Sequence, residues 1–106
     1  MHLTITRFEV TQPIDRDQLT TLFQQSLPRY SAAPGLLSKH YYVEPESRFA
    51  GGIYLWASPE EAQAFLTPAF SEAIRARFGG MPTIQVLDCP LTLDNIHGEH
   101  RMAADR

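Results

Sequence analysis

A run of alternating apolar and aromatic residues at 50–56, Ala-Gly-Gly-Ile-Tyr-Leu-Trp, most tightly constrains how this chain folds. Because side chains along a strand alternate between its two faces, Tyr54 and Trp56 share one face with Gly52, and aliphatic side chains occupy the other. Adjacent glycines cost backbone entropy in a strand, so they mark a bulge or the close approach of another group. The run therefore predicts a strand that is covered on both faces, with room for a cavity beside its two aromatic rings.

The residues that follow this strand carry helix-start signals. Ser58, Pro59 and Glu61 stand at the N-cap, first and third positions of a predicted helix, where these residue types are preferred. Residues 67–68, Thr-Pro, restart a helix, and the Gly-Gly pair at 79–80 is a helix stop. Two consecutive helices are therefore expected after the strand.

Hydrophobic periodicity and turn residues define the remaining segments. The predicted strands are residues 2–10, 36–43, 49–57 and 83–88. A helix capped by Asp15 or Asp17 is expected between the first two strands, and Pro28 together with the pair Pro34-Gly35 is expected to end it. A turn at 44–47 is expected to connect the second strand to the third.

The resulting order of elements is βαββαβ. This order predicts an α+β fold of the ferredoxin-like type, with a four-stranded antiparallel sheet and helices on one face. A chain of 106 residues has the length of one domain, so we expect a single domain over residues 1–106. The segment at about 97–106 is polar and terminal, and it is expected to be a mobile tail.

Composition and charge argue against several classes of partner. The net charge of -3, with basic residues scattered along the chain, argues against nucleic-acid binding. The apolar runs are far shorter than a membrane span, and the first residues lack the features of a secretion signal. Cys89 has no second cysteine with which to form an internal disulfide, which agrees with a reducing compartment. We therefore expect a cytoplasmic protein that binds neither nucleic acid nor membrane.

A sheet with helices on one face leaves its other face uncovered. We expect that uncovered face to carry Tyr54 and Trp56, together with aromatic residues from the strand at 36–43. A contiguous apolar patch of that kind costs a monomer solubility. Two copies that pair their sheets face to face cover the patch and enclose a pocket, so a homodimer is expected.

Four features of the sequence occur together in one known family: Pro-Gly-Leu-Leu at 34–37, Lys39, the run at 50–56 and the helix start at 58–62. On these residues the chain resembles the small monooxygenases of the dimeric α/β-barrel superfamily. The resemblance covers roughly residues 8–96 and implies a ferredoxin-like protomer that pairs into a dimeric α/β barrel, with a cavity in each subunit. It also implies cofactor-independent monooxygenase activity, since better-understood relatives oxidise polycyclic phenols to quinones with dioxygen alone. No motif in this chain transfers a catalytic residue from those relatives.

The resemblance implies a small hydroxylated aromatic, or a similarly electron-rich molecule, as the substrate. Tyr54 and Trp56 can stack a planar ring and orient it by hydrogen bonds. Gly52 leaves space beside them, and Tyr42 is a further candidate contact. Phe70 lies next to the break between the two later helices, where it can gate the pocket. The alternative interpretation is that these aromatic side chains only pack a dimer interface.

Two neighbouring residues compete for the role of catalytic group. His40 lies mid-strand, and its ordinary pKa of about 6.5 suits proton abstraction from a phenol. Lys39 is the only lysine, and it can hold a phenolate or a superoxide-like anion. Consecutive strand residues point to opposite faces, so only one of the two can face the cavity; the same holds for Tyr41 and Tyr42. The sequence leaves this choice open, and we take His40 as the predicted catalytic residue.

No metal and no organic cofactor is expected. His97 and His100 lack a third ligand of suitable type, and residues 58–78 contain no histidine to bind a haem. The glycine pattern of dinucleotide-binding proteins is also absent. Two other functions stay open: a non-catalytic small-molecule-binding protein that uses the same pocket, and a dimerisation module whose aromatic side chains fill the interface.

Overall fold

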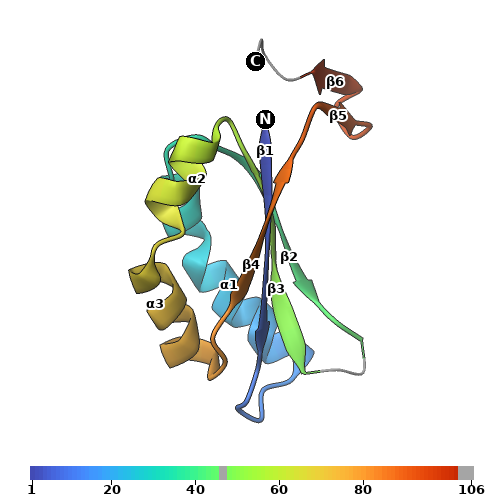
Figure 1. The fold of residues 1–106 in the computed structure, drawn as a ribbon. Coiled ribbons are helices and arrows are strands. Elements are labelled where there is room, and N and C mark those ends of the chain that lie inside the picture. Colours follow the sequence, from blue (N-terminus) through green and yellow to red (C-terminus); the bar gives the residue numbers. More distant parts are fainter. Residues whose placement is uncertain (46–47, 103–106) are drawn as a thin grey trace.

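Four strands form one antiparallel sheet in the computed structural model, which describes residues 1–45 and 48–102 (Figure 1). These strands are β1 (His2–Glu9), β2 (Leu36–Val43), β3 (Phe49–Trp56) and β4 (Thr83–Asp88). Their order across the sheet is β2-β3-β1-β4, and every neighbouring pair is antiparallel. This is the ferredoxin-like arrangement, so the fold class expected from the sequence is confirmed.

Three helices lie against one face of the sheet (Figure 1). They are α1 (Arg16–Ser31), α2 (Pro59–Phe65) and α3 (Pro68–Phe78). Their N-caps are Asp15, Ser58 and Thr67, whose side-chain oxygens accept backbone N–H groups of the first turn. Gly79, with a φ of 105°, ends α3 in a conformation that a residue with a side chain rarely adopts. Both later helices thus begin and end where the sequence predicts.

Helix α1 ends at Ser31, before Pro34 and Gly35 but past Pro28, so of the two expected stops Pro28 is wrong. Pro28 lies in the last turn, where its missing N–H removes one hydrogen bond near an end that frays in any case. The turn beyond it carries Tyr30, which is buried against the rings of Tyr41 and Tyr54. Burial of this large aromatic side chain offsets the cost of the proline.

The hydrophobic core lies between the helices and the sheet. Tyr54 and Trp56 are 1% and 0% exposed, and they pack against Tyr30, Ala62 and Phe70. The expectation that these two aromatic residues lie on the uncovered face is therefore wrong. With this orientation of β3 the two largest side chains are buried under the helices, and the smaller aliphatic ones are left outside, which buries the most apolar area.

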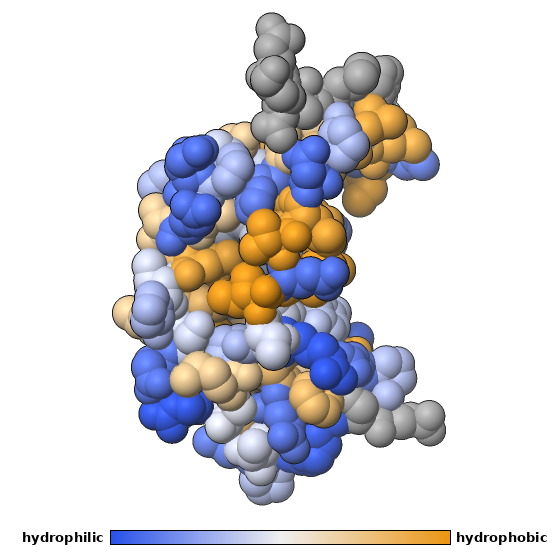
Figure 2. All heavy atoms as spheres, viewed as in Figure 1, coloured by the Kyte–Doolittle hydropathy of each residue, from blue (hydrophilic) through white to orange (hydrophobic). Residues whose placement is uncertain are grey.

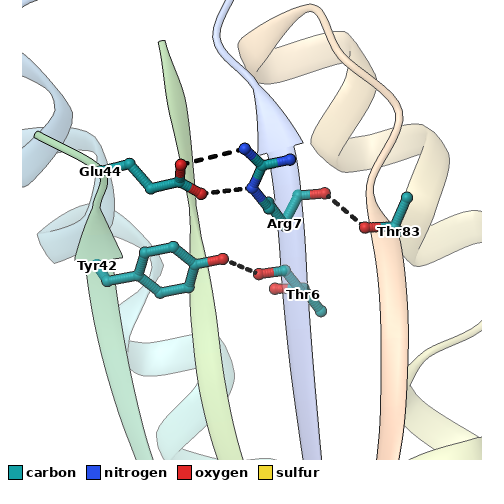
Figure 3. A network of polar contacts seen from close by, with 5 residues as sticks. All are labelled: Thr6, Arg7, Tyr42, Glu44 and Thr83. Atoms are coloured by element: carbon teal, nitrogen blue, oxygen red, sulfur yellow. Dashed lines mark hydrogen bonds and ion pairs between the residues drawn. The ribbon is translucent and has the colours of Figure 1, made fainter. Parts of the chain in front are cut away.

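The face of the sheet opposite the helices carries a polar network (Figure 3). The hydroxyl of Tyr42 crosses β3 and donates to the backbone oxygen of Thr6 at 2.8 Å. This crossing requires Gly51, because a Cβ there would lie 1.9 Å from the Thr6 oxygen and 2.8 Å from the Tyr42 hydroxyl. Beside it, Arg7 forms an ion pair with Glu44. The close approach expected at the glycine pair is thus made by a neighbouring tyrosine.

A separate two-stranded sheet follows β4 and projects from one end of the molecule (Figure 1). It pairs β5 (Leu91–Asp94) with β6 (Glu99–Met102), whereas the sequence predicts a tail over 97–106. The turn forms because the Asp94 carboxylate accepts the backbone N–H groups of Ile96 and His97, and Gly98 adopts a φ of 67°.

Residues 103–106 of the predicted tail, and residues 46–47 of the predicted turn, lie outside the described residues. Across the part of the chain that is described, no helix is long and apolar enough to cross a bilayer.

Candidate functional site

Lys39 enters the helix-covered side of the sheet and lies among three tyrosine rings. Its ammonium nitrogen is 3.2 Å from the ring centre of Tyr30, 3.8 Å from that of Tyr41 and 4.7 Å from that of Tyr54. These tyrosines come from α1, β2 and β3, and we call them the tyrosine cage. The only lysine of the chain is thus held where three structural elements meet.

Gly52 makes room for this lysine. A Cβ at position 52 would lie 2.9 Å from Cε of Lys39 and 3.0 Å from the ring of Tyr54. The sequence predicts that a small residue here leaves space beside the aromatic side chains, and the stem of Lys39 fills that space. Contact between Gly52 and a ligand stays a prediction.

The electrostatic environment makes Lys39 titrate far below its ordinary range. Burial lowers the pKa of Lys39 to about 6, and the positive charge of Arg29 acts in the same direction. The faces of the three tyrosine rings favour the ammonium form and oppose part of this shift. Burial of the amine is the larger effect, so near neutral pH Lys39 can both accept and release a proton. Burial raises the pKa of the Tyr54 phenol, which therefore stays protonated.

A small cavity adjoins the amine. Its volume is about 30 Å³, and its walls include Lys39, the tyrosine cage, Thr6, Ser26 and Arg77. The hydroxyls of Ser26 and Tyr41 lie 2.9 Å apart and form a hydrogen bond. A cavity of this volume holds one or two water molecules, or a diatomic molecule of similar size, but not an aromatic ring. We call it the inner cavity.

His40 and Tyr42 do not line the inner cavity. His40 pairs with Ile53 and is exposed on the face opposite the helices, and the Tyr42 hydroxyl binds the backbone of Thr6 on that same face. The expectation that His40 converges with Tyr54 and Trp56 on one enclosed volume is therefore wrong. A register shift between Leu36 and Ser38 places Lys39, and not His40, beside Tyr54.

Trp56 and Phe70 lie behind the site. The indole N–H of Trp56 donates to the Thr4 hydroxyl at 3.0 Å, and its ring stacks on Tyr54 with centres 5.9 Å apart. Phe70 is 1% exposed and packs against Phe65. Neither side chain lines the inner cavity, so both support its walls in this conformation. That they contact a ligand stays a prediction.

Sequence reasoning missed Tyr30 and Ser26. Both belong to the buried stripe of α1, since Ser26 and Tyr30 are four residues apart and Ser26 follows Phe23 by three. The signal for Ser26 lies within the predicted helix, whereas the signal for Tyr30 is visible only if the helix is continued beyond Pro28. Once α1 ends at Ser31, Tyr30 falls on the face that meets the sheet.

The fold and the site together define a ferredoxin-like protein that holds a titratable amine in an aromatic pocket. The sequence profile of a family described as "Putative mono-oxygenase ydhR" matches residues 3–87, and the chain belongs to this family. The resemblance noted from the sequence is thereby confirmed. No curated protein sequence is matched.

Solved structures show the same fold at low sequence identity. A variant of SnoaB, a cofactor-independent oxygenase from Streptomyces nogalater, superposes with a TM-score of 0.62 at 17% identity, over 87% of this chain and 95% of that one. The protein YJCS superposes with a TM-score of 0.61 at 14% identity, over 84% of this chain and 99% of that one. At these identities the similarity establishes the architecture.

Proposed function

We propose that this protein is a cofactor-independent monooxygenase that acts on a small hydroxylated aromatic, with Lys39 as its base. The observation that carries the proposal is the amine of Lys39, which titrates near neutral pH at the wall of a cavity of dioxygen size. Membership of the monooxygenase family supports the reaction class. His40, which the sequence favours for this role, lies on the other face of the sheet.

The chemistry needs only the substrate, dioxygen and this base. The neutral amine of Lys39 accepts the phenol proton, and the phenolate then gives one electron to dioxygen. The two radicals combine to form a carbon–oxygen bond, and loss of water from the resulting peroxide yields a quinone. One oxygen atom enters the product and the other leaves as water, while the substrate supplies all the electrons. The Lys39 ammonium stabilises the phenolate and the superoxide formed along this route.

An aromatic substrate requires a wall of the inner cavity to move. Phe23 and Tyr41 are the suitable side chains, because they line the inner cavity and also a larger groove outside it. Their rings pack with centres 5.0 Å apart, and the hydrogen bond between Tyr41 and Ser26 holds them in place. Displacement of this pair brings a substrate hydroxyl within reach of Lys39 and still excludes bulk water.

Oxygen uptake tests this function. We expect the purified protein, with no added cofactor, to consume dioxygen and form the quinone when it is given hydroxynaphthalenes or other polycyclic phenols. The variant His40→Gln serves as the control, and its rate is expected to stay within about twofold of the wild type. If the phenols bind without any oxygen uptake, the protein is instead a non-catalytic binding protein.

We further propose that the protein is a homodimer in which the uncovered sheet faces pair. Leu3, Ile5, Ile53 and Leu55 are only partly covered on this face. Figure 2 shows further apolar side chains exposed near the sheet and on the β5–β6 hairpin, where Leu93 is 66% exposed. Apolar surface of this extent favours association.

Sedimentation velocity at micromolar concentration is expected to give a species of twice the chain mass of 12.0 kDa. The variant Ile5→Arg places a charge in the centre of the paired face and should shift the protein to a monomer. A wild-type monomer under these conditions contradicts the proposed pairing.

A further inference from the structure

Two ligand-sized hollows lie along the seam between α1 and the edge strand β2. The first, which we call the outer groove, has a volume of about 500 Å³ and is lined by Phe23, Leu27, Tyr41 and the predicted contact residue Tyr42 among others. The second, the end hollow, has a volume of about 340 Å³. Small-molecule sites usually span about 300–1,000 Å³, so both hollows fit the body of a ligand and the inner cavity does not.

Shared walls place the three hollows in a row. Arg16 and Val43 line both the end hollow and the outer groove. Phe23 and Tyr41 line both the outer groove and the inner cavity. A molecule that lies in the outer groove therefore has Arg16 at one end and, behind the Phe23–Tyr41 pair, Lys39 at the other.

The surfaces along this row are suited to an apolar ring. Phe23 and Tyr41 offer aromatic faces, and Leu27 is 48% exposed although it is apolar. On α1, residues 16, 20, 23, 24 and 27 recur at helical spacing, so their side chains form one continuous stripe toward β2. Phe23 follows Arg16 by seven positions, which corresponds to about 10 Å along the helix and to the length of two fused rings.

The charge at the outer end of the row is positive. Within residues 1–45 and 48–102, three other charged groups nearby are engaged: Asp15 caps α1, Glu44 pairs with Arg7, and Arg48 donates to backbone oxygens of Val10 and Gln12. Arg16 forms no ion pair in that part of the chain. The guanidinium of Arg16 is at the first position of α1, where the positive end of the helix dipole repels it. An anion beside Arg16 is attracted by both the guanidinium and the N-terminus of the helix.

We infer that the substrate is a bicyclic hydroxylated aromatic carboxylate, whose carboxylate pairs with Arg16 while its ring lies in the outer groove and its hydroxyl points toward Lys39. This inference rests on the proposed function and specifies its substrate class. Asp17, in the first turn of α1, is the acidic side chain that works against an anion here. The planar guanidinium outweighs it because it can bind both carboxylate oxygens.

Equilibrium binding without oxygen tests the inference separately from catalysis. The probes are 6-hydroxy-2-naphthoate and 2-naphthol, which share the ring and the hydroxyl and differ in the carboxylate. We expect the wild type to bind the naphthoate at least about tenfold more tightly than the naphthol. Arg16→Gln should lose this preference, and Arg16→Lys should keep part of it. The matched control is Arg75→Gln, since Arg75 is an exposed arginine paired with Glu72 on α3, and it should keep the full preference.

The outcomes separate the two proposals. If the wild type binds both probes equally, or if Arg16→Gln keeps the preference, the inference is wrong even where oxygen uptake is observed. If the preference depends on Arg16 but no phenol is oxidised, the carboxylate site stands and the monooxygenase proposal fails. Thermal melting of each variant confirms that the exposed substitutions leave the protein folded.

Discussion

Replacement of Lys39 by methionine is expected to abolish oxidation and to make the folded protein more stable at neutral pH. Loss of a general base typically lowers the rate by a factor of about 100 to 10,000, so turnover should fall at least about 100-fold. Methionine is unbranched, apolar and of similar length, so it can fill the tyrosine cage. It avoids the cost of burying an amine, and we expect the free energy of unfolding at pH 7 to rise by roughly 1–3 kcal/mol.

The difference in stability between Lys39→Met and the wild type is expected to depend on pH. Lys39 has a pKa of about 6 in the folded protein and about 10.4 in the unfolded chain. Between these values the unfolded chain binds more protons, so the contribution of Lys39 to stability increases as the pH rises from about 6 to 10, and it is constant below pH 6. Lys39→Met lacks this contribution. Its stability advantage over the wild type, measured by urea unfolding, should therefore shrink between pH 6 and pH 9.

A rival physical account predicts the opposite sign. If attraction between the ammonium and the tyrosine faces exceeds the cost of burial, Lys39→Met is less stable than the wild type at pH 6. That result would contradict a titratable amine near neutral pH. The activity measurement has its own control, because His40→Gln removes the neighbouring titratable group on the opposite face and should leave turnover nearly unchanged.

Gly51→Ala is expected to be the most destabilising small substitution in the sheet. The new Cβ would lie 1.9 Å from the backbone oxygen of Thr6 and 2.8 Å from the hydroxyl of Tyr42. The backbone oxygen belongs to a central strand and cannot move aside without breaking the pairing of β1 with β3. We expect a loss of roughly 2–4 kcal/mol in the free energy of unfolding, at the upper end for overpacked sites. Urea unfolding at constant pH measures it.

Gly52→Ala is the matched control, because it lies next to Gly51 on the opposite face of the same strand. Its new Cβ would lie 2.9 Å from Cε of Lys39, which belongs to a flexible side chain, and 3.0 Å from the ring of Tyr54, and neither contact is with backbone. The loss of stability should therefore be only about 1 kcal/mol. Displacement of Lys39 should instead reduce turnover. Equal stability losses in the two variants would show that the close approach of Tyr42 and Thr6 does not constrain position 51.

The parts of the fold that could be predicted from the sequence are those set by local signals, such as helix caps and helix ends. Ser58 and Thr67 cap helices through hydrogen bonds within one turn, and Gly79 ends a helix through its own backbone conformation. Such effects depend on a few consecutive residues and can be recognised without the rest of the chain. Pro28 misled the prediction because its local cost is outweighed by the burial of Tyr30 against residues far away in sequence.

The candidate site was predicted only in part. The alternation at 50–56 correctly placed Tyr54 and Trp56 on one face with Gly52, because alternation is a property of any strand. Which face the helices cover is not contained in that pattern, since both orientations have the same period. The structure decides it by the apolar area that β3 buries against α1, α2 and α3, which are distant in sequence.

The sequence by itself therefore determined the order of helices and strands as far as β4, the caps of α2 and α3, and the family to which the chain belongs. Only the tertiary structure decided that Lys39, and not His40, meets the aromatic side chains. Two consecutive strand residues are equivalent until the register is known, and here a shift between Leu36 and Ser38 sets the register of β2 against β3. The chemistry of the site thus depends on a pairing between strands that no single segment encodes.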